Sequence, residues 1–309
     1  MPTFMFSEGV TVVPAVTLLG VVIGVDIGTT STKAVAYDTD GRQLGSHLVG
    51  YPLNNPQPGY AEQDPQLILD AVLKSISMVV AELVQPVAGL SFGSAMHSLI
   101  GLDRDGNPLT PSVTWADSRS TRQAERLRAV PSGLALHRRT GTPMHPMSPL
   151  PKLLWFAEQE PKLFERVAHW VGIKEWVLLR LCGALVTDHS IASATGLLDI
   201  HELKWDHEAL TIAGITQEQL PQLVATTAVL PNLTPQAAAE TGLPQRTPVV
   251  VGAGDGPLAN LGLGAVHPGM VACSIGTSGA MRVMVERPGV DPLGGVFCYA
   301  LTEHRWAVG

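Results

Sequence analysis

The sequence predicts an α/β protein made of two related units, and three observations support this prediction. The 309 residues exceed the usual length of a single domain. Short apolar strands alternate with segments whose apolar residues recur at helical spacing. Two distant stretches, beginning at Val22 and Met270, repeat the same order of strand, Ile-Gly-Thr turn and strand. A ligand held by both turns would lie in a cleft between the two units.

The first unit is expected to open with a three-stranded meander. Its first two strands flank the glycine turn, and Asp40-Gly41 is a strong hairpin signal before the third. A helix then begins at Pro65 with Asp64 as its N-cap, because Asp caps helices and Pro favours their first position. The expected strands are residues 21–26, 32–38, 44–50 and 87–94.

The middle of the chain is predicted to be largely helical. A strand ends at Thr114-Trp115, and Val249–Val251 forms another strand that enters a glycine-rich turn and a helix. Helices are expected within residues 117–129, 150–183 and 231–248, and Gly183 is a plausible residue to end the second. The helical spacing of Leu153, Phe156, Trp170 and Trp176 is typical of core residues. The predicted division is an extension at 1–20, a first unit at 21–248 and a second at 249–309.

Composition excludes several classes of protein. Hydrophobic residues make up 45% and charged residues 15% of the chain, which favours a compact globular protein. The net charge of −7 without a basic block argues against nucleic-acid binding. Proline and glycine interrupt the apolar run Val10–Val25, so a membrane helix is not expected. No basic region precedes the run, so a signal peptide is not expected either. Cys182, Cys273 and Cys298 lack metal-site spacing, which fits unpaired thiols in the cytoplasm.

The two glycine turns suggest a site for phosphate. Glycine frees backbone N–H groups to point into one concavity, and threonine hydroxyls add further donors. Lys33 and Arg282 follow the two turns and add positive charge. Neither standard phosphate-binding loop motif fits, and one copy alone would favour an ordinary hairpin turn. The second copy, and Asp26 before the first, favour the phosphate site.

Asp255 is a candidate general base. It lies between a hydrophobic strand and a helix, with glycines on both sides that would let a ligand approach closely. In that position it could accept the proton of a hydroxyl that attacks a phosphoryl group. A helix-capping role is an equally common use of aspartate. Asp26 could hold Mg²⁺, which takes few carboxylates and keeps several waters.

With these residues assembled, the sequence resembles the FGGY carbohydrate kinases, which are two-domain enzymes of the actin-like ATPase (ribonuclease H-like) fold. The resemblance runs from Val21 to Gly309. Its most specific motif is M-S-P-L-P-K-L-L-W-F-A-E-Q, which begins at Met147. The other matching motifs are D-I-G-T-T-S-T-K from Asp26, G-A-G-D-G-P-L-A-N-L-G from Gly252 and S-I-G-T-S-G from Ser274.

Within the family, four motifs look most like those of gluconate kinases. They are S-A-M-H-S-L from Ser94, T-W-A-D-S-R from Thr114, R-T-G-T-P-M-H-P-M-S-P-L from Arg139 and S-I-A-S-A-T-G-L from Ser190. Xylulose kinases are similar around Met96-His97, so xylulose or another polyol stays an alternative substrate. The resemblance implies transfer of phosphate from ATP, with Mg²⁺, to D-gluconate to give 6-phosphogluconate. The partners expected are the sugar acid and ATP, without nucleic acid or membrane, and a homodimer is left open.

The resemblance also implies a role for individual residues. Asp255 matches the catalytic base, and Asp26 matches the aspartate near Mg²⁺. The phosphate hairpins correspond to Gly28, Thr29, Thr30 and Lys33, and to Gly276, Thr277 and Ser278. The residues expected to face the sugar are Met96, His97, Trp115, Asp117, Arg119 and Lys174.

Three of the sugar-facing residues have plainer interpretations. His97 could be an ordinary histidine at the end of a strand. Asp117 could be the N-cap of the following helix, and Arg119 could be one more surface charge. Only their clustering after two strand ends favours a sugar site, in which Arg119 could also pair with a carboxylate.

The family's second domain continues past the residue that corresponds to Gly309. We therefore expect a complete first domain followed by the beginning of the nucleotide-binding domain, which puts catalysis by this chain alone in doubt. An open second unit should also expose sheet edges and apolar surface. A non-catalytic sugar-binding protein is the remaining alternative, and a DNA-binding sugar sensor is the weakest.

Overall fold

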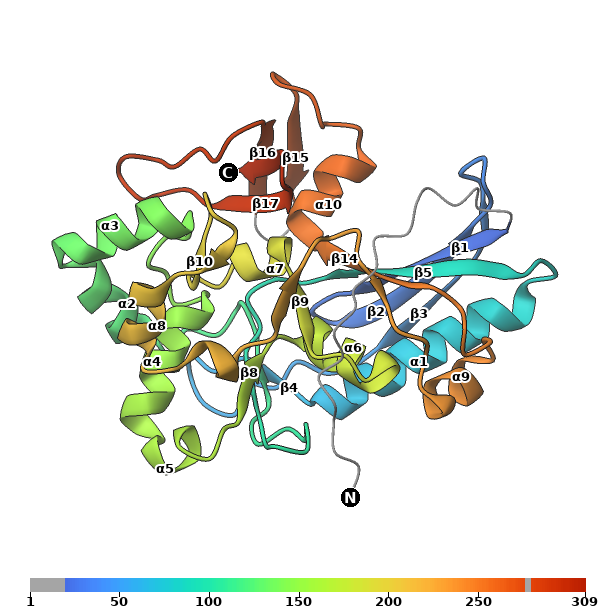
Figure 1. Cartoon of the computed structure of the whole chain (residues 1–309), viewed down its shortest axis with the longest axis horizontal. Coiled ribbons are helices and arrows are strands. Elements are labelled where there is room, and N and C mark those ends of the chain that lie inside the picture. The colour runs from blue at the N-terminus through green and yellow to red at the C-terminus, as the bar shows by residue number, and fades with distance from the viewer. Residues whose placement is uncertain (1–19, 276–278) are drawn as a thin grey trace.

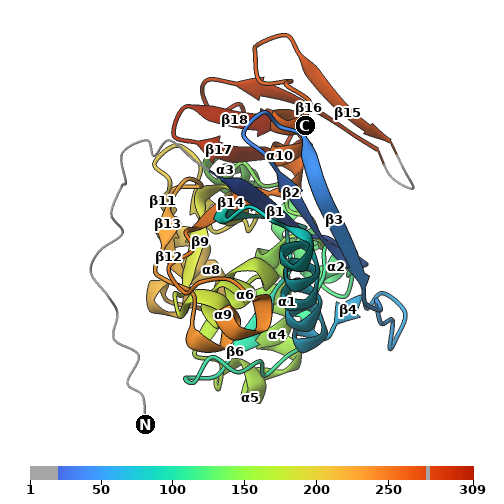
Figure 2. The same cartoon turned by 90° about the vertical axis from the view of Figure 1, so that its right-hand side faces the viewer.

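The computed structural model describes residues 20–275 and 279–309. They form a larger unit of helices around a six-stranded sheet and a smaller unit around a four-stranded sheet (Figures 1 and 2). The predicted extension ahead of Gly20 lies outside the described residues. The same holds for Gly276, Thr277 and Ser278 of the second turn.

A six-stranded sheet in the order β13-β14-β5-β1-β2-β3 forms the centre of the first unit. β1, β5 and β14 are parallel, and the other three strands pair antiparallel with their neighbours. The expected strands near the N-terminus are confirmed to within one residue at each end. The strands are β1 (Val21–Ile27), β2 (Ser31–Tyr37), β3 (Gln43–Gly50), β5 (Val87–Ser94), β13 (Val229–Leu230) and β14 (Val249–Gly254).

Alternating side chains bury one face of this sheet against α1 (Pro65–Glu82). On β1 the buried positions are Val21, Ile23, Val25 and Ile27, as the two-residue period of a strand requires. On α1, the helical spacing buries Ile68, Val72, Ile76 and Val79. The predicted cap is confirmed, because the Asp64 carboxylate accepts a hydrogen bond from the Gln66 amide at 2.8 Å. These residues belong to one core with α6 (Ile173–Cys182) and α9 (Pro235–Thr241).

A second core lies among the helices of the middle segment and includes Leu153, Phe156 and Trp170, as expected. Gly183 ends α6 in the left-handed conformation with φ 69°. The middle segment is less helical than the sequence predicts, because β8 (His169–Val171) pairs with β6 (Ile100–Leu102). Its helices are α2 (Thr121–Arg128), α3 (Pro131–Thr140), α4 (Pro149–Gln159), α5 (Pro161–Phe164), α7 (His189–Ser193) and α8 (His207–Ala213).

Short strand pairs and one 3₁₀ turn connect these elements. They are β4 (Glu62–Gln63) with β7 (Ser112–Val113), β9 (Val186–Asp188) with β12 (Gln222–Val224), β10 (Leu198–Asp199) with β11 (Lys204–Trp205), and η1 (Gln217–Gln219). Within the described ranges, no helix combines the length and apolar character needed to cross a membrane.

A smaller four-stranded sheet, in the order β15-β16-β18-β17, follows α10 (Asp255–Gly262). β15 and β16 form an antiparallel hairpin like that of β1 and β2, so the predicted repetition of the hairpin is confirmed. β15 is an edge strand, and Ile275 on it is 85% exposed, in line with the expected apolar surface. The strands are β15 (Val271–Ile275), β16 (Gly279–Val285), β17 (Cys298–Thr302) and β18 (Arg305–Val308).

β14 belongs to the larger sheet. It pairs with β5 and β13, so strand pairing extends the first unit past residue 248, where the sequence placed its end. In Figure 1 the small sheet and α10 lie together above α7 and the end of β14.

Candidate active site

Three parallel strands end at the same edge of the larger sheet, and two acidic residues meet there. Asp26 near the end of β1 pairs with Gly93 on β5, and Gly93 pairs with Ala253 on β14. Asp255 follows directly after β14. A Cβ built at Gly93 would lie 3.7 Å from Oδ1 of Asp26 and 3.1 Å from Leu258 on α10. The strand order therefore brings together the candidate base and the candidate metal ligand.

Asp255 is the first residue of α10, and Gly254 is the N-cap. Its Oδ1 accepts a hydrogen bond from the Gly256 amide at 2.7 Å. The side chain is open to solvent on one side, yet burial by the surrounding protein raises the pKa of its carboxyl. The hydrogen bond from the Gly256 N–H lowers this pKa, the charge of Asp26 raises it, and the charge of Arg282 lowers it. A carboxylate with a raised pKa at a strand end is suited to accept a proton.

Asp26 faces solvent beside the first hairpin, directly across from Lys33 on β2. Burial raises the pKa of Asp26, and the charge of Lys33 opposes that rise. Because the charge of Asp26 in turn disfavours ionisation of Asp255, a divalent cation near the pair would relieve their repulsion. The two carboxylates thus fit Mg²⁺. Among the described residues, no group of three or more His, Cys, Asp or Glu could hold a metal ion.

The first hairpin, predicted to bind phosphate, is fixed by partners from several elements. The Gly28 amide donates to the Ser31 carbonyl at 2.9 Å, and the Tyr51 hydroxyl donates to the Gly28 carbonyl at 2.7 Å. The indole N–H of Trp115 donates to Oγ1 of Thr29 at 2.8 Å. Trp115 is 38% exposed and therefore presents its ring beside the hairpin. Thr30 and Lys33 are exposed.

Met96 and His97 are buried next to the candidate base. A Cβ added at Gly254 would come within 2.8 Å of the Met96 sulfur, so Met96 packs directly on the strand end before Asp255. His97 has a left-handed backbone with φ 69°, which is uncommon for a residue other than glycine. Burial lowers the pKa of His97 to about 3, and the charge of Lys152 contributes. Its two ring nitrogens lie 2.8 Å from the Ala194 carbonyl and 3.2 Å from the Tyr299 hydroxyl.

Asp117 and Arg119 form a buried ion pair. Their side chains are 0% and 4% exposed, and Nη2 of Arg119 lies 2.8 Å from Oδ2 of Asp117. Arg119 also bonds Glu62 at 2.5 Å and lies over the ring of Tyr60 at 3.8 Å. Asp117 accepts the Ala61 amide at 2.7 Å, whereas Ser120 is the N-cap of α2. Asp117 is therefore not the N-cap of α2, and Arg119 is not a surface charge. The pair instead fixes the segment at residues 60–62.

Comparison with known proteins then identifies the family. The FGGY family of carbohydrate kinases, N-terminal domain, matches residues 21–262. The chain belongs to this family. The gluconokinase of Bacillus subtilis (strain 168) is 42% identical over 288 residues, which cover 93% of this chain and 56% of that protein. A xylulose kinase of the same strain is 31% identical and covers 84% of this chain and 52% of that protein.

Solved structures agree with this family. The gluconate kinase from Lactobacillus acidophilus matches with a TM-score of 0.91 and 39% identity, over 93% of this chain and 58% of that one. A ligand-bound xylulose kinase from the same species gives the same TM-score and identity, over 93% and 59%. These likenesses confirm the predicted actin-like α/β fold. This FGGY chain spans little more than half the length of the relatives it matches.

Lys174, the last residue predicted to face the sugar, lies in a buried ion pair. Its side chain is 1% exposed, and its Nζ lies 2.5 Å from Oδ2 of Asp188, which is 0% exposed. Oδ1 of Asp188 accepts the amides of Ser190 and Ile191 and so caps α7. Oγ of Ser190 in turn accepts the Gly254 amide at 3.1 Å. Lys174 therefore connects to Asp255 through α7 rather than through an open cleft.

Sequence reasoning gave no role to the residues of the S-I-A-S-A-T-G-L motif, although it used the motif to compare this chain with gluconate kinases. In the FGGY fold the motif contributes all of α7 except its first residue, and the four residues that follow the helix. Ser193 bonds Thr142 through its carbonyl and Ala300 through its hydroxyl, while Ala194 bonds His97. The motif thus joins the predicted sugar site to β17 of the small sheet.

Lys152 was also missed, although it is the lysine of the most specific family motif. Its side chain is fully buried, and its Nζ donates to the carbonyls of His97 and Thr114, each at 2.7 Å. Burial lowers the pKa of Lys152 to about 7, although the negative charge of Asp117 acts to raise it. The motif contains this lysine, but only the fold shows its role: it holds together the two segments that carry His97 and Trp115.

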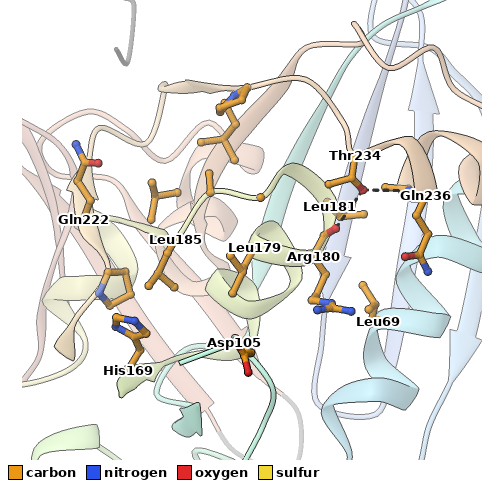
Figure 3. Close-up of a pocket in the computed structure, with 18 of the residues that line it drawn as sticks. Leu69, Asp105, His169, Leu179, Arg180, Leu181, Leu185, Gln222, Thr234 and Gln236 are labelled. Atoms are coloured by element: carbon orange, nitrogen blue, oxygen red, sulfur yellow. Dashed lines mark hydrogen bonds between the residues drawn. The ribbon is translucent and has the colours of Figure 1, made fainter. Parts of the chain in front are cut away.

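A cavity of about 1330 Å³ lies away from these residues (Figure 3). Leu69, Arg180, Gln222 and Gln236 are among its lining residues, and Thr234 donates a hydrogen bond to the Arg180 carbonyl beside it. Its wall includes β13, which pairs with the start of β14, whereas Asp255 follows the opposite end of β14. None of the predicted site residues that the structure describes lines this cavity, so it is separate from the candidate active site.

Proposed function

We propose that this FGGY chain acts in the ATP-dependent phosphorylation of a sugar acid, D-gluconate, to 6-phosphogluconate. The observation that supports this most strongly is the position of Asp255 at the end of β14, beside Asp26 and the first hairpin. Among the curated relatives, gluconokinases at 42 and 43% identity favour gluconate over the xylulose named for relatives at 31%, whereas the two solved structures at 39% identity favour neither. Mg²⁺ and a cytoplasmic location belong to the same proposal.

In the proposed mechanism, the terminal hydroxyl of gluconate attacks the γ-phosphorus of ATP. A new bond forms between that oxygen and phosphorus, the bond from phosphorus to the β,γ-bridging oxygen breaks, and ADP leaves. Asp255 accepts the proton of the attacking hydroxyl. Thr29, Thr30 and Lys33 would offer N–H, hydroxyl and ammonium donors to the phosphates, and Gly28, whose amide bonds the Ser31 carbonyl, would shape the turn that presents them. Mg²⁺ held near Asp26 would neutralise phosphate charge.

A panel of acceptors tests this function. We expect the protein to phosphorylate D-gluconate faster than D-xylulose or D-glucitol, which carry no carboxylate. Because this chain spans 56% of the Bacillus subtilis gluconokinase, we would measure turnover in the chain and in a fusion that adds the corresponding remainder of that enzyme. D-xylulose as the best acceptor would support the xylulose kinase alternative. Gluconate binding without turnover, even in the fusion, would support a sugar-binding protein.

The pH dependence of turnover gives a second prediction. Asp255 must be ionised to accept a proton, so activity should fall as the pH drops through its raised pKa. The charge of Arg282 lowers that pKa, and its guanidinium carbon would lie 3.1 Å from a Cβ placed at Gly256. Arg282→Met should therefore raise the pKa further and move the acid limb of kcat/KM to higher pH.

The control for this experiment is Arg305→Met. Arg305 lies in the same small sheet, where it pairs with Glu286 at 2.8 Å, and it does not contribute to the pKa of Asp255. The acid limb of kcat/KM for the Arg305→Met fusion should coincide with that of the unmodified fusion. An acid limb that stays in place or moves to lower pH in Arg282→Met would show that Arg282 does not act on the base.

A further inference from the structure

The hydrogen bonds of His97 determine which of its ring nitrogens carries a proton. Nδ1 lies 2.8 Å from the carbonyl oxygen of Ala194, and a carbonyl oxygen only accepts, so Nδ1 must be the donor. His97 is neutral at ordinary pH, because burial and the charges of Lys152, His145 and Arg282 lower its pKa to about 3. A neutral imidazole has one N–H. Nε2 therefore accepts, and the Tyr299 hydroxyl, 3.2 Å away, donates to it.

Backbone bonds on both sides hold Tyr299 in place. The amide of Cys298 donates to the Gly141 carbonyl at 2.8 Å, and the amide of Ala300 donates to Oγ of Ser193 at 3.0 Å. The Tyr299 ring stacks on Phe297 with centroids 5.1 Å apart and an interplanar angle of 19°. Tyr299 is only 4% exposed. Its hydroxyl is therefore fixed toward His97 by the small sheet and by α7 together.

We propose that Tyr299 is a positioning residue that donates to Nε2 of the Nδ1-protonated His97 ring, holds that ring in place, and so makes this end of the acceptor site receive a hydroxyl rather than a carboxylate. The Tyr299 hydroxyl occupies the single lone pair of Nε2, so the unused group there is a lone pair on the tyrosine oxygen, which accepts a hydrogen bond. A sugar hydroxyl can donate to it, whereas an ionised carboxylate has no proton to donate. The second half of this inference rests on the proposed function.

Nitrogen NMR of the 309-residue chain, labelled with ¹⁵N-histidine, tests the first half. The unmodified chain should show His97 protonated on Nδ1, with Nε2 accepting a hydrogen bond. Tyr299→Phe keeps the ring but removes the donor, so the Nε2 resonance should move toward that of a free acceptor nitrogen. Tyr37→Phe removes another hydroxyl, on a 37% exposed tyrosine of β2, and should leave His97 unchanged. A proton on Nε2, or an unaltered His97 spectrum in Tyr299→Phe, would overturn the assignment.

Calorimetric titration of the same chains with D-gluconate tests the second half. Loss of one hydrogen-bonding partner should weaken gluconate binding roughly three- to tenfold in Tyr299→Phe and leave Tyr37→Phe nearly unaffected. Equal affinity in all three chains would overturn the role of Tyr299 in the acceptor site. If no chain binds gluconate while the NMR result holds, the proposed function fails and the tautomer assignment stands. Circular dichroism of each variant confirms that it is folded.

Discussion

Asp255→Asn is expected to reduce turnover by about 10²- to 10⁴-fold, which is the usual contribution of a general base. Asparagine has nearly the same shape, and its oxygen can still accept the Gly256 amide that Oδ1 accepts at 2.7 Å. It cannot take up the proton of the attacking hydroxyl. The measurement is kcat of the fusion protein with D-gluconate, together with the affinity of the 309-residue chain for gluconate, which should change little.

Asp70→Asn is the matched control for the base. Asp70 lies exposed on α1, where it bonds Gln66, and its replacement should leave turnover unchanged. Turnover of Asp255→Asn within a few-fold of the unmodified fusion would exclude Asp255 as the base. A large loss of gluconate affinity, with kcat preserved, would instead make Asp255 a residue that only binds the sugar.

The second large effect is expected in stability. Lys174→Met leaves the carboxylate of Asp188 fully buried without its cation, and breaking a buried pair in this way costs roughly 3–5 kcal/mol. The two amides that Asp188 accepts at the start of α7 moderate the loss, so we expect about 3 kcal/mol. Urea denaturation of the 309-residue chain, followed by circular dichroism, measures this change in the free energy of unfolding.

Two further variants separate charge from packing. Lys204→Met replaces an exposed lysine and should change stability by no more than about 0.5 kcal/mol. Combining Lys174→Met with Asp188→Asn removes the unpaired charge while the amide oxygen can still cap α7, so the double variant should be more stable than Lys174→Met alone. If the double variant is no more stable, the loss comes from packing, and the ion pair is not its cause.

Local features of the fold were predictable because their causes lie within a few residues of sequence. The cap at Asp64, the end of α6 at Gly183 and the two antiparallel hairpins all follow from neighbouring residues. The β8 strand was missed because its pairing partner, β6, lies far earlier in the chain. A short apolar segment between helices carries no local sign of such a distant partner.

For the candidate site, residue types were easier to predict than their partners. Asp26 and Asp255 do meet at one sheet edge, as parallel strand ends require. The pairing of Asp117 with Arg119 rather than with a helix end, and of Lys174 with Asp188, depends on which distant segments the fold brings together. The bond between His97 and Tyr299 joins residues 202 positions apart and leaves no periodic signal in the sequence.

The bonds of β17 have a consequence for how the molecule unfolds. Gly141, Ser193 and Thr226 of the first unit bond the backbone of Cys298, Ala300 and Leu301. Local opening of β17 therefore cannot occur without breaking contacts of the larger core, so strand and core should open as one cooperative unit. The edge strand β15 has neighbours on one side only and can fray separately. The cooperative boundary thus runs through the small sheet, and the integrity of the predicted sugar site depends on a strand from beyond the first unit.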